Sequence, residues 1–576
     1  MTTGSAGGKH TDPAISSRSV DWALLVTLPI YLIAVVVLWW AILSRTGEIS
    51  YTVDDAYIHG TLAKNLIASG TFGIVPGEFA AASSSPLWTL LLALVFSVTG
   101  PGPWIPALLA TLFGALTIER SNSLLGSLSL GAVTRVVVIL MALAYAPVLP
   151  ILSTGMEHTL HAWTMVGLFA SLLGCFREKS SSPANVFVWA LLAASARYES
   201  LFALPPLLIF LALRRKWTTA FALGCGMALP GLAFAIYSVA HGGFALPNSL
   251  IMKGNLAGAG HLRALQLAWD NPHILVLLVL LAAAAGVSHF CRKPAEVMPT
   301  WFPVTLMTMI MIHLQLAQLG WFYRYEGYLV MLGLLTAATL LVPLQKWLRG
   351  RSIAFSIGVY VVLAAVTFPL GRRCVRATGE IVHAAGNIYD QQYQMALVTR
   401  HLGKGARVAV NDLGAVSFLT DARVLDLFGL GDNRLARAKV SRHLAGGSRS
   451  AAKNPGAPSF LSIAQLRKLV GLGNSAEPEI PYGAERLQLR LKETRTDFVI
   501  CYPSWFVGRE QLPDTLIPVE TWVLGDNLIC GGDTVVFYGT SPEAAGKLAA
   551  ALAAYRAQGA ASPRSTNRMQ PRVATN

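Results

Sequence analysis

The sequence predicts a polytopic α-helical membrane protein of about eleven transmembrane helices, followed by an extracytoplasmic α/β domain. Of its 576 residues, 54% are hydrophobic and 13% are charged, against roughly 25% charged in a soluble domain. The mean hydropathy is +0.52. This composition excludes a soluble enzyme, a disordered protein and a nucleic-acid binder for most of the chain, because so much apolar surface must face lipid.

Apolar segments recur along the first 370 residues. The first, from Trp22 to Leu43, is long enough to cross a bilayer, starts late and lacks a small-residue cleavage site, so we expect a retained helix rather than a signal peptide. We expect residues 86–99 to lie as a helix against the outer face, because counting them as a crossing reverses the topology downstream. The other expected crossings are 104–118, 136–152, 159–175, 185–196, 200–213, 217–239, 274–290, 300–319, 326–345 and 352–370.

Basic residues orient this topology. The formal net charge is +15, and groups such as Arg214-Arg215-Lys216 fall on the same side as the N-terminus, as the positive-inside rule requires. The exception, Arg372-Arg373 with Arg376, opens an expected folded domain rather than a short loop. The predicted parts are a cytoplasmic tail at 1–21, a transmembrane domain at 22–370 with its first outer loop at 44–85, an extracytoplasmic domain at 371–545 and a disordered tail at 546–576.

The C-terminal part contains short apolar runs separated by turn residues. Such runs predict the strands of a small sheet packed by helices. Six cysteines are scattered without a CxxC pair, which argues against a zinc site or a disulfide framework. A Cys501–Cys530 bridge stays open as the less favoured alternative. The predicted strands are 407–410, 424–427, 497–501 and 534–538.

An acidic pair, Asp54-Asp55, follows the first apolar segment by about ten residues. The residues after it, including Tyr57 and Ile58, continue one apolar face of a helix. A carboxylate that is partly desolvated between a membrane-edge helix and apolar cover can have a raised pKa and accept a proton from a hydroxyl, or it can bind a cation or a sugar hydroxyl. The alternative is a solvated loop with two acids.

Three basic residues, Arg197, Lys253 and Arg324, fall on the same predicted side. Each alone is equally well a long side chain that reaches the membrane surface from a helix end. Together, cations beside an apolar groove suit a lipid-linked phosphate, whose charge must be neutralised while its chain stays in lipid.

Acids and histidines in the other outer turns complete the candidate set. Glu157 begins a helix, where a carboxylate either favours the helix dipole or binds a hydroxyl or a cation. Glu199 is placed to pair with Arg197 or Arg324. His59 and His158 are isolated histidines, which argues against metal ligation. No GxGxxG, GxxxxGK or GxSxG motif marks a nucleotide site or a hydrolase triad.

These motifs occur as an ordered series between about residues 20 and 540. The series is Asp54-Asp55-Ala56-Tyr57-Ile58, Asn65-Leu66, Pro76-Gly77-Glu78, Ser84-Ser85-Pro86-Leu87-Trp88, Thr154-Gly155-Met156-Glu157, Arg197-Tyr198-Glu199, Leu246-Pro247-Asn248 with Lys253, Asn411-Asp412-Leu413-Gly414 and Asp426-Leu427-Phe428-Gly429-Leu430. It resembles the GT-C class of membrane glycosyltransferases, and within it the terminal arabinofuranosyltransferases of cell-wall arabinan. The ordered series is fairly specific for the class and much less specific for the sugar.

The resemblance implies a glycosyltransferase in a bacterial cytoplasmic membrane whose active site faces the periplasm or the cell exterior. A polyprenyl-phosphate sugar, arabinofuranose first, would be the donor, and a glycan or glycoconjugate the acceptor. The resemblance implies no particular cofactor, and a divalent cation stays open. The implied catalytic residues are Asp54 and Asp55; the implied substrate-binding residues are Lys253, Arg197, Arg324, Glu157, Glu199, Tyr57, Asn65 and His59.

Two other classes of protein remain as alternatives. A transporter or flippase for lipid-linked saccharides, with an outer sensor domain, would also need many helices and a polar groove, but it predicts functional charges deep inside the membrane spans. A catalytically inactive scaffold that binds lipid-linked sugar is the third possibility.

Overall fold

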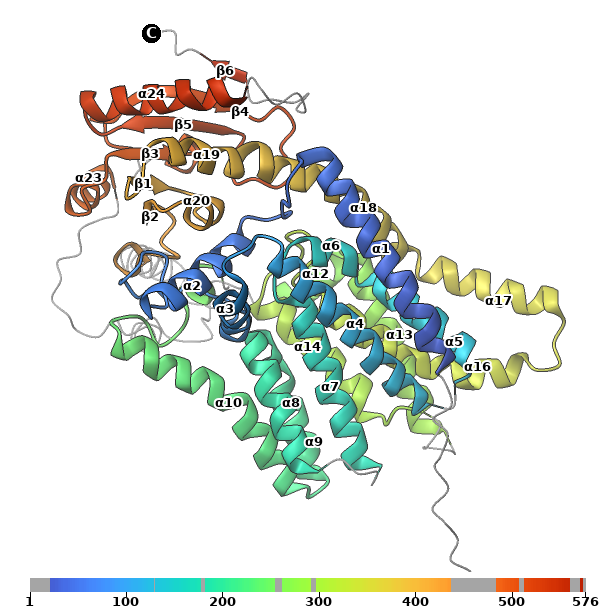
Figure 1. Ribbon diagram of the computed structural model, residues 1–576. Helices are drawn as coiled ribbons and strands as arrows, with labels where there is room; N and C mark the ends of the chain where they lie inside the picture. Colours follow the sequence, from blue (N-terminus) through green and yellow to red (C-terminus); the bar gives the residue numbers. More distant parts are fainter. Residues whose placement is uncertain are drawn as a thin grey trace, which may run out of the picture.

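A bundle of helices with a β-sheet at one end makes up the fold (Figure 1). The structure is a computed structural model. It describes residues 21–128, 130–177, 182–253, 262–291, 297–436, 483–506, 512–559 and 570–572.

The bundle consists of apolar helices joined by short turns. Its α-helices are α1 (Trp22–Thr46), α2 (Asp55–Ser69), α3 (Pro86–Thr99), α4 (Ile105–Gly126), α5 (Ala132–Tyr145), α6 (Val148–Ser153), α7 (His158–Phe176), α8 (Pro183–Ala196), α9 (Leu204–Leu213), α10 (Trp217–Ala240), α11 (Asn248–Lys253), α12 (Arg263–Asp270), α13 (Pro272–Phe290), α14 (Trp301–Leu316), α15 (Gly327–Ala337), α16 (Leu341–Leu348), α17 (Ile353–Val366) and α18 (Phe368–Ile388).

Large apolar side chains cover much of the outside of this bundle. On α1, Tyr31, Val35 and Leu38 recur at helical spacing and are buried against the neighbouring helices. The opposite face exposes Ile33 and Val36, and α17 has no buried residue at all. Apolar surface of this extent is what lipid contact requires, since a soluble monomer rarely exposes it.

Five helices in the described part of the chain are long and apolar enough to cross a membrane, or six if α17 and the helix that follows it are one bent span. The predicted number of about eleven crossings is not confirmed. Residues 136–152, expected to be one crossing, divide at Pro147 into α5 and α6, because a proline interrupts helical hydrogen bonding. The expected crossing at 352–370 bends by 59° at the break between α17 and α18.

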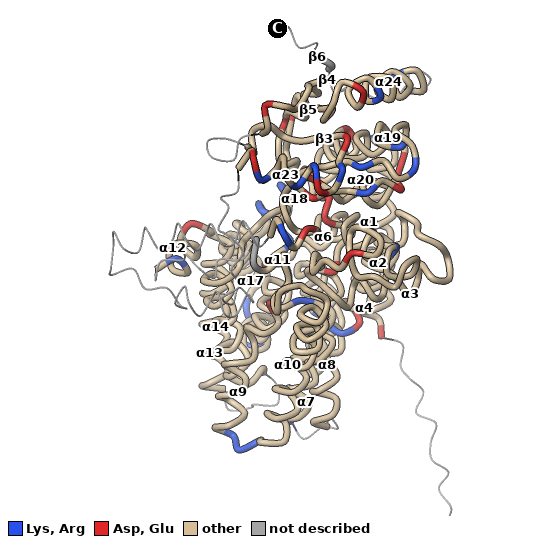
Figure 2. The backbone as a smooth tube through the Cα atoms, turned by 90° about the vertical axis from the view of Figure 1, so that its left-hand side faces the viewer, with Lys and Arg blue, Asp and Glu red and all other residues tan. Residues whose placement is uncertain are grey.

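Polar contacts hold the end of the bundle that lies far from the sheet. Asp21, at the start of α1, accepts hydrogen bonds from Asn122 (2.8 Å) and Arg135 (3.0 Å). Arg177 donates to the backbone oxygen of Ser127 (2.8 Å). Figure 2 shows the basic loop after α9 at the end of the bundle far from the strands.

A six-stranded mixed sheet forms the core of the C-terminal part. Its strand order is β2-β1-β3-β5-β4-β6, with β1 parallel to β2 and β3, and β5 antiparallel to β3 and β4. Each of the four predicted strands is found within one residue of its expected ends. The strands are β1 (Arg407–Val410), β2 (Arg423–Asp426), β3 (Phe498–Cys501), β4 (Ile517–Val523), β5 (Thr534–Gly539) and β6 (Gln570–Arg572).

Alternating side chains along these strands pack the sheet on both faces. Val408 and Ile500 face a core shared with α19 (Gln394–His401), α20 (Gly414–Leu419) and α24 (Pro542–Gly559). Ala409 and Val499 face the other side, where α23 (Ala484–Glu493) packs. A π-helical turn, Tyr389–Tyr393, joins α18 to α19, so the long α18–α19 segment connects the bundle to the sheet.

Two expectations for the C-terminal part change. The predicted disordered tail at 546–576 is wrong over its first part, because α24 runs to Gly559 and buries Leu548 and Leu552 against the sheet, and β6 pairs with β4. The Cys501–Cys530 bridge is not formed: both thiols are free and buried, and Cys530 Sγ donates to Gln392 Oε1 (3.4 Å).

Candidate active site

The acidic pair lies at the N-terminal end of α2, with Asp54 as the N-cap residue and Asp55 as the first helical residue. Successive side chains on a helix diverge by about 100°. The two carboxylates therefore face different parts of the protein: Asp55 faces the bundle, and Asp54 faces the C-terminal sheet and its helices.

Asp55 pairs with Arg324, one of the predicted cations. Arg324 donates to Asp55 Oδ2 at 2.5 Å and to Met156 Sδ at 2.8 Å, and its guanidinium lies over the ring of Tyr325 at 5.1 Å. The Arg324 side chain is 1% exposed and that of Asp55 is 20% exposed. Burial lowers the pKa of Arg324, but Tyr325 and Asp55 outweigh it and raise the pKa above its ordinary value.

The turn that carries Arg324 has an unusual backbone. Trp321, Phe322 and Tyr323 have φ values of 40°, 58° and 62°, a left-handed conformation that bulky residues rarely adopt. Arg373 of α18 holds this turn through a hydrogen bond to the Tyr323 oxygen (3.1 Å) and an ion pair with Glu326. Strain of this kind persists only where surrounding contacts determine the conformation, and here they place Arg324 against α2.

A second cluster surrounds Arg197 at the C-terminal end of α8. Arg197 donates to Glu199 Oε1 at 2.6 Å and forms an ion pair with Glu157. Glu157 also accepts a hydrogen bond from Ser84 (3.0 Å), and its Oε2 lies 3.5 Å from His59 Nε2. Glu157 is fully buried, so a carboxylate, a guanidinium and an imidazole share one water-poor site.

The two clusters share a wall. The ring of Tyr325 lies beneath both guanidiniums, at 5.8 Å from Arg197 and 5.1 Å from Arg324. Four of the expected outer segments, 44–85, 153–158, 197–199 and 321–326, therefore meet at one end of the bundle. Together the two clusters contain three carboxylates and two guanidiniums, so their charges nearly balance.

Asp54 contacts the other part of the protein, 360 residues away in the chain. Its Oδ2 accepts from the Gly414 amide (2.6 Å) and its Oδ1 from the Ala415 amide (2.8 Å). Burial, followed by the nearby carboxylate of Asp412, raises the pKa of Asp54 to about 8. Gly414 permits this approach, because a Cβ there would lie 2.6 Å from Asp54 Oδ2.

A buried hydrogen-bond network continues from Asp412. Its Oδ2 accepts from Tyr502 OH (2.6 Å) and from Gln392 Nε2 (2.9 Å). Tyr502 OH also lies 2.6 Å from Gln391 Oε1. Gln391 and Gln392 are on the π-helical turn, a feature that is frequent at functional sites. None of these network residues was predicted as a site residue from the sequence, although Asp412 and Gly414 lie in one of the motifs on which the family resemblance rests.

The remaining predicted residues have varied surroundings. Tyr57 is buried beside Tyr51 and Phe418. Asn65 donates to the backbone oxygens of Gly73 and Ile74, both at 2.8 Å, and so shapes the loop after α2. Lys253 is the last residue of α11, and its side chain lies outside the described part of the structure.

No group of three or more His, Cys, Asp or Glu side chains that could hold a metal ion occurs among the residues that the structure describes. The carboxylates of the site are instead paired with arginines or backbone amides.

Comparison with solved structures shows the fold of ArnT from Cupriavidus metallidurans. The apo structure of that protein matches with a TM-score of 0.51 and 13% sequence identity, over 90% of this chain and 98% of ArnT. The structure of ArnT bound to undecaprenyl phosphate matches with a TM-score of 0.49 and 12% identity over the same shares. The chain therefore has an ArnT-like fold.

Sequence comparison adds one match. Residues 386–445 match a domain of unknown function (DUF8728). This segment includes the π-helical turn, Asp412 and the two amides that bind Asp54. No curated protein sequence matches the chain.

Proposed function

We propose that this protein is an integral membrane glycosyltransferase that moves a sugar from a polyprenyl-phosphate donor to a hydroxyl of a glycan or glycoconjugate, on the outer side of the cytoplasmic membrane. The observation that carries the proposal is the Asp55–Arg324 pair beside the Glu157–Arg197–Glu199 cluster, at one end of an apolar bundle with an ArnT-like fold. ArnT itself has been crystallised bound to undecaprenyl phosphate.

The arginines suit the donor phosphate. Arg324 Nε is buried and has no hydrogen-bond partner within the described residues, so a phosphate oxygen would satisfy a donor that is otherwise left unpaired. Guanidinium groups bind phosphate through paired N–H donors. The polyprenyl chain would lie along the exposed apolar faces of the helices.

The carboxylates suit the acceptor. In the proposed reaction the acceptor hydroxyl attacks the anomeric carbon, the bond from that carbon to the phosphate oxygen breaks, and the hydroxyl proton passes to a carboxylate. We assign this base to Asp55, which lies at the phosphate-binding arginine. Asp54, whose two oxygens are each held by a backbone amide, positions the start of α2.

The donor sugar we propose is arabinofuranose, and the support for it is the ordered motif series rather than the fold. The fold is shared with ArnT at 13% identity, which carries no information on the sugar. The test therefore compares polyprenyl-phosphate donors that differ only in the sugar.

The test is transfer by the purified full-length chain in lipid nanodiscs, with radiolabelled polyprenyl-phosphate arabinofuranose and a second polyprenyl-phosphate sugar. A general base contributes about 10²–10⁴-fold, so Asp55→Asn should lower transfer by that factor. Asp421→Asn removes an exposed carboxylate (side chain 59% exposed) near the same helix and should leave transfer unchanged. Absence of transfer from every donor, with lipid flipping in liposomes, would favour the transporter instead.

A further inference from the structure

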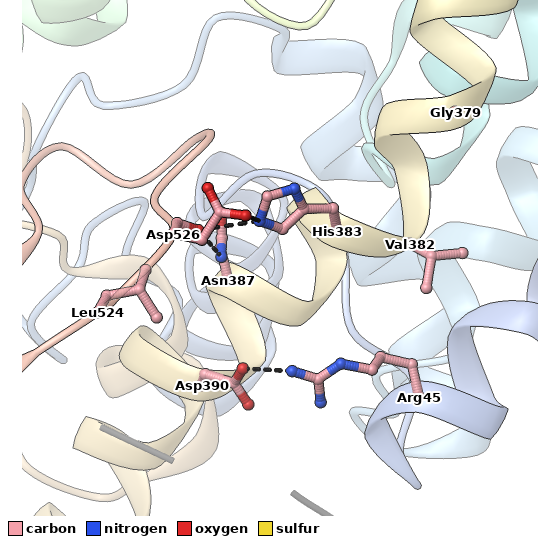
Figure 3. Close-up of a pocket in the computed structure, with 8 residues that line it drawn as sticks. All are labelled: Arg45, Gly379, Val382, His383, Asn387, Asp390, Leu524 and Asp526. Atoms are coloured by element: carbon pink, nitrogen blue, oxygen red, sulfur yellow. Dashed lines mark hydrogen bonds and ion pairs between the residues drawn. The ribbon is translucent and has the colours of Figure 1, made fainter. Parts of the chain in front are cut away.

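A cavity lies apart from the arginine clusters, between the C-terminal end of α1, one face of α18 and the loop from β4 to β5. Its volume is about 370 Å³, near the lower end of the roughly 300–1,000 Å³ of small-ligand sites. Figure 3 shows Arg45 and Asp390 on one side of the hollow and His383, Asn387 and Asp526 on the other.

The walls of the cavity are fixed by hydrogen bonds. Arg45 donates to Asp390 Oδ2 at 2.6 Å. On the opposite wall, His383 Nε2 and Asn387 Nδ2 both lie 2.9 Å from the backbone oxygen of Asp526. The β4–β5 loop is thereby tied to α18, and the cavity is preformed rather than dependent on a ligand to close it.

The lining combines hydrogen-bond donors and acceptors with two apolar side chains, Val382 and Leu524. Its charged and titratable groups are the carboxylates of Asp390 and Asp526, the Arg45 guanidinium and the His383 imidazole. Carboxylate, amide, imidazole and guanidinium groups suit closely spaced sugar hydroxyls, and apolar side chains suit the C–H face of a sugar ring. Gly379 contributes open space, because a Cβ there would meet no atom within 4 Å.

The cavity adjoins the network around Asp54. Asp390, on its wall, precedes Gln391 and Gln392 in the π-helical turn. Gln392 donates to Asp412, and the Asp412 carboxylate contributes to the raised pKa of Asp54. A ligand in the cavity would therefore lie beside the π-helical turn whose Gln392 side chain contacts Asp412.

We propose that this cavity binds a neutral saccharide, and, resting on the glycosyltransferase function proposed above, that the saccharide is part of the acceptor glycan. The arginine clusters would then hold the donor phosphate while the α18 cavity holds the acceptor at a distance from the reacting hydroxyl.

The test is direct binding to the full-length protein in detergent, measured by saturation-transfer NMR with two probes, a linear arabinofuranose tetrasaccharide and a mannopyranose tetrasaccharide. Gly379→Leu places a side chain in the cavity and should weaken probe binding at least tenfold. Gly546→Leu, on α24, also meets open space and should leave binding within twofold. Asp526→Ala, at an exposed position (side chain 76% exposed), should weaken binding severalfold and replaces Gly379→Leu if that variant does not fold.

The outcomes separate this proposal from the proposed function. Binding that depends on Gly379, without sugar transfer, supports the cavity and contradicts the enzyme. Transfer with an unchanged acceptor KM in Gly379→Leu supports the enzyme and overturns the cavity, whereas a raised acceptor KM with unchanged kcat supports both. The saccharide-binding cavity is also contradicted if the wild-type protein binds neither probe, or if inorganic phosphate displaces a bound probe.

Discussion

The contact between Gly414 and Asp54 makes a sharp prediction about the junction between the bundle and the C-terminal sheet. In Gly414→Ala the new Cβ would lie 2.6 Å from Asp54 Oδ2 and closer still to the Asp54 backbone oxygen. Neither atom can move away easily. The Asp54 oxygen belongs to the backbone, and the Asp54 carboxylate is held by the amides of residues 414 and 415. Either α20 or the start of α2 must move.

The magnitude follows from two terms. Overpacking of a tight contact costs about 1–3 kcal/mol, and weakening two hydrogen bonds costs about 0.5–1.5 kcal/mol each. We expect the free energy of unfolding to fall by about 2–6 kcal/mol in total. At roughly 2 °C per kcal/mol for a large chain, the melting temperature should fall by about 4–12 °C.

Gly546→Ala is the matched control. Its Cβ meets no atom within 4 Å, and it lies within α24, where replacing glycine with alanine stabilises by about 0.4–1 kcal/mol. The two variants should therefore change the melting temperature in opposite directions, followed by tryptophan fluorescence in detergent. Transfer activity should also fall at least tenfold in Gly414→Ala, because Asp55 is displaced with α2. A Gly414→Ala protein that melts as high as Gly546→Ala would refute the assigned contact.

Three further predictions concern titration, ion pairing and the thiols. Burial raises the pKa of Asp54 to about 8 from 3.8. The wild type should therefore lose stability relative to Asp54→Asn as the pH rises from about 4 to about 8, and the difference in stability should level off above about pH 8. Melting curves at several pH values check this prediction, and a stability difference that does not change with pH contradicts it. A double-mutant cycle of Asp55→Asn and Arg324→Gln should give a coupling energy of about 0.5–3 kcal/mol in unfolding experiments, whereas additive effects would argue against the 2.5 Å pair. Maleimide should label Cys501 and Cys530 only after unfolding and without any reductant, since both are free and buried; a need for reductant would reveal a disulfide.

The segment at 386–445 gains a structural role from this arrangement. It supplies the amides that bind Asp54, the Asp412 carboxylate and the glutamines of the π-helical turn. Thr61 and Lys64 of α2 also contact it, through Ser417 (2.8 Å) and the Thr420 oxygen (3.1 Å). The start of α2 is thus held between the bundle on one side and this segment on the other.

Three features were predictable from the sequence: the apolar composition that requires contact with lipid, four of the six strands of the C-terminal sheet, and the position of the acidic pair after the first helix. These features are local, because hydrophobic length, strand alternation and residue order are readable from neighbouring positions. The number of crossings was not determined in this way, since prolines and bends divide apolar segments that look continuous.

The difference between the two acids depends on tertiary packing. Helical geometry sends Asp54 and Asp55 in different directions, but which carboxylate meets Arg324 and which meets Gly414 depends on segments about 270 and 360 residues away. Such contacts come from the packing of the whole chain, in which the strained turn at 321–323 and the start of α20 bring distant residues against α2. A local sequence pattern carries no record of them.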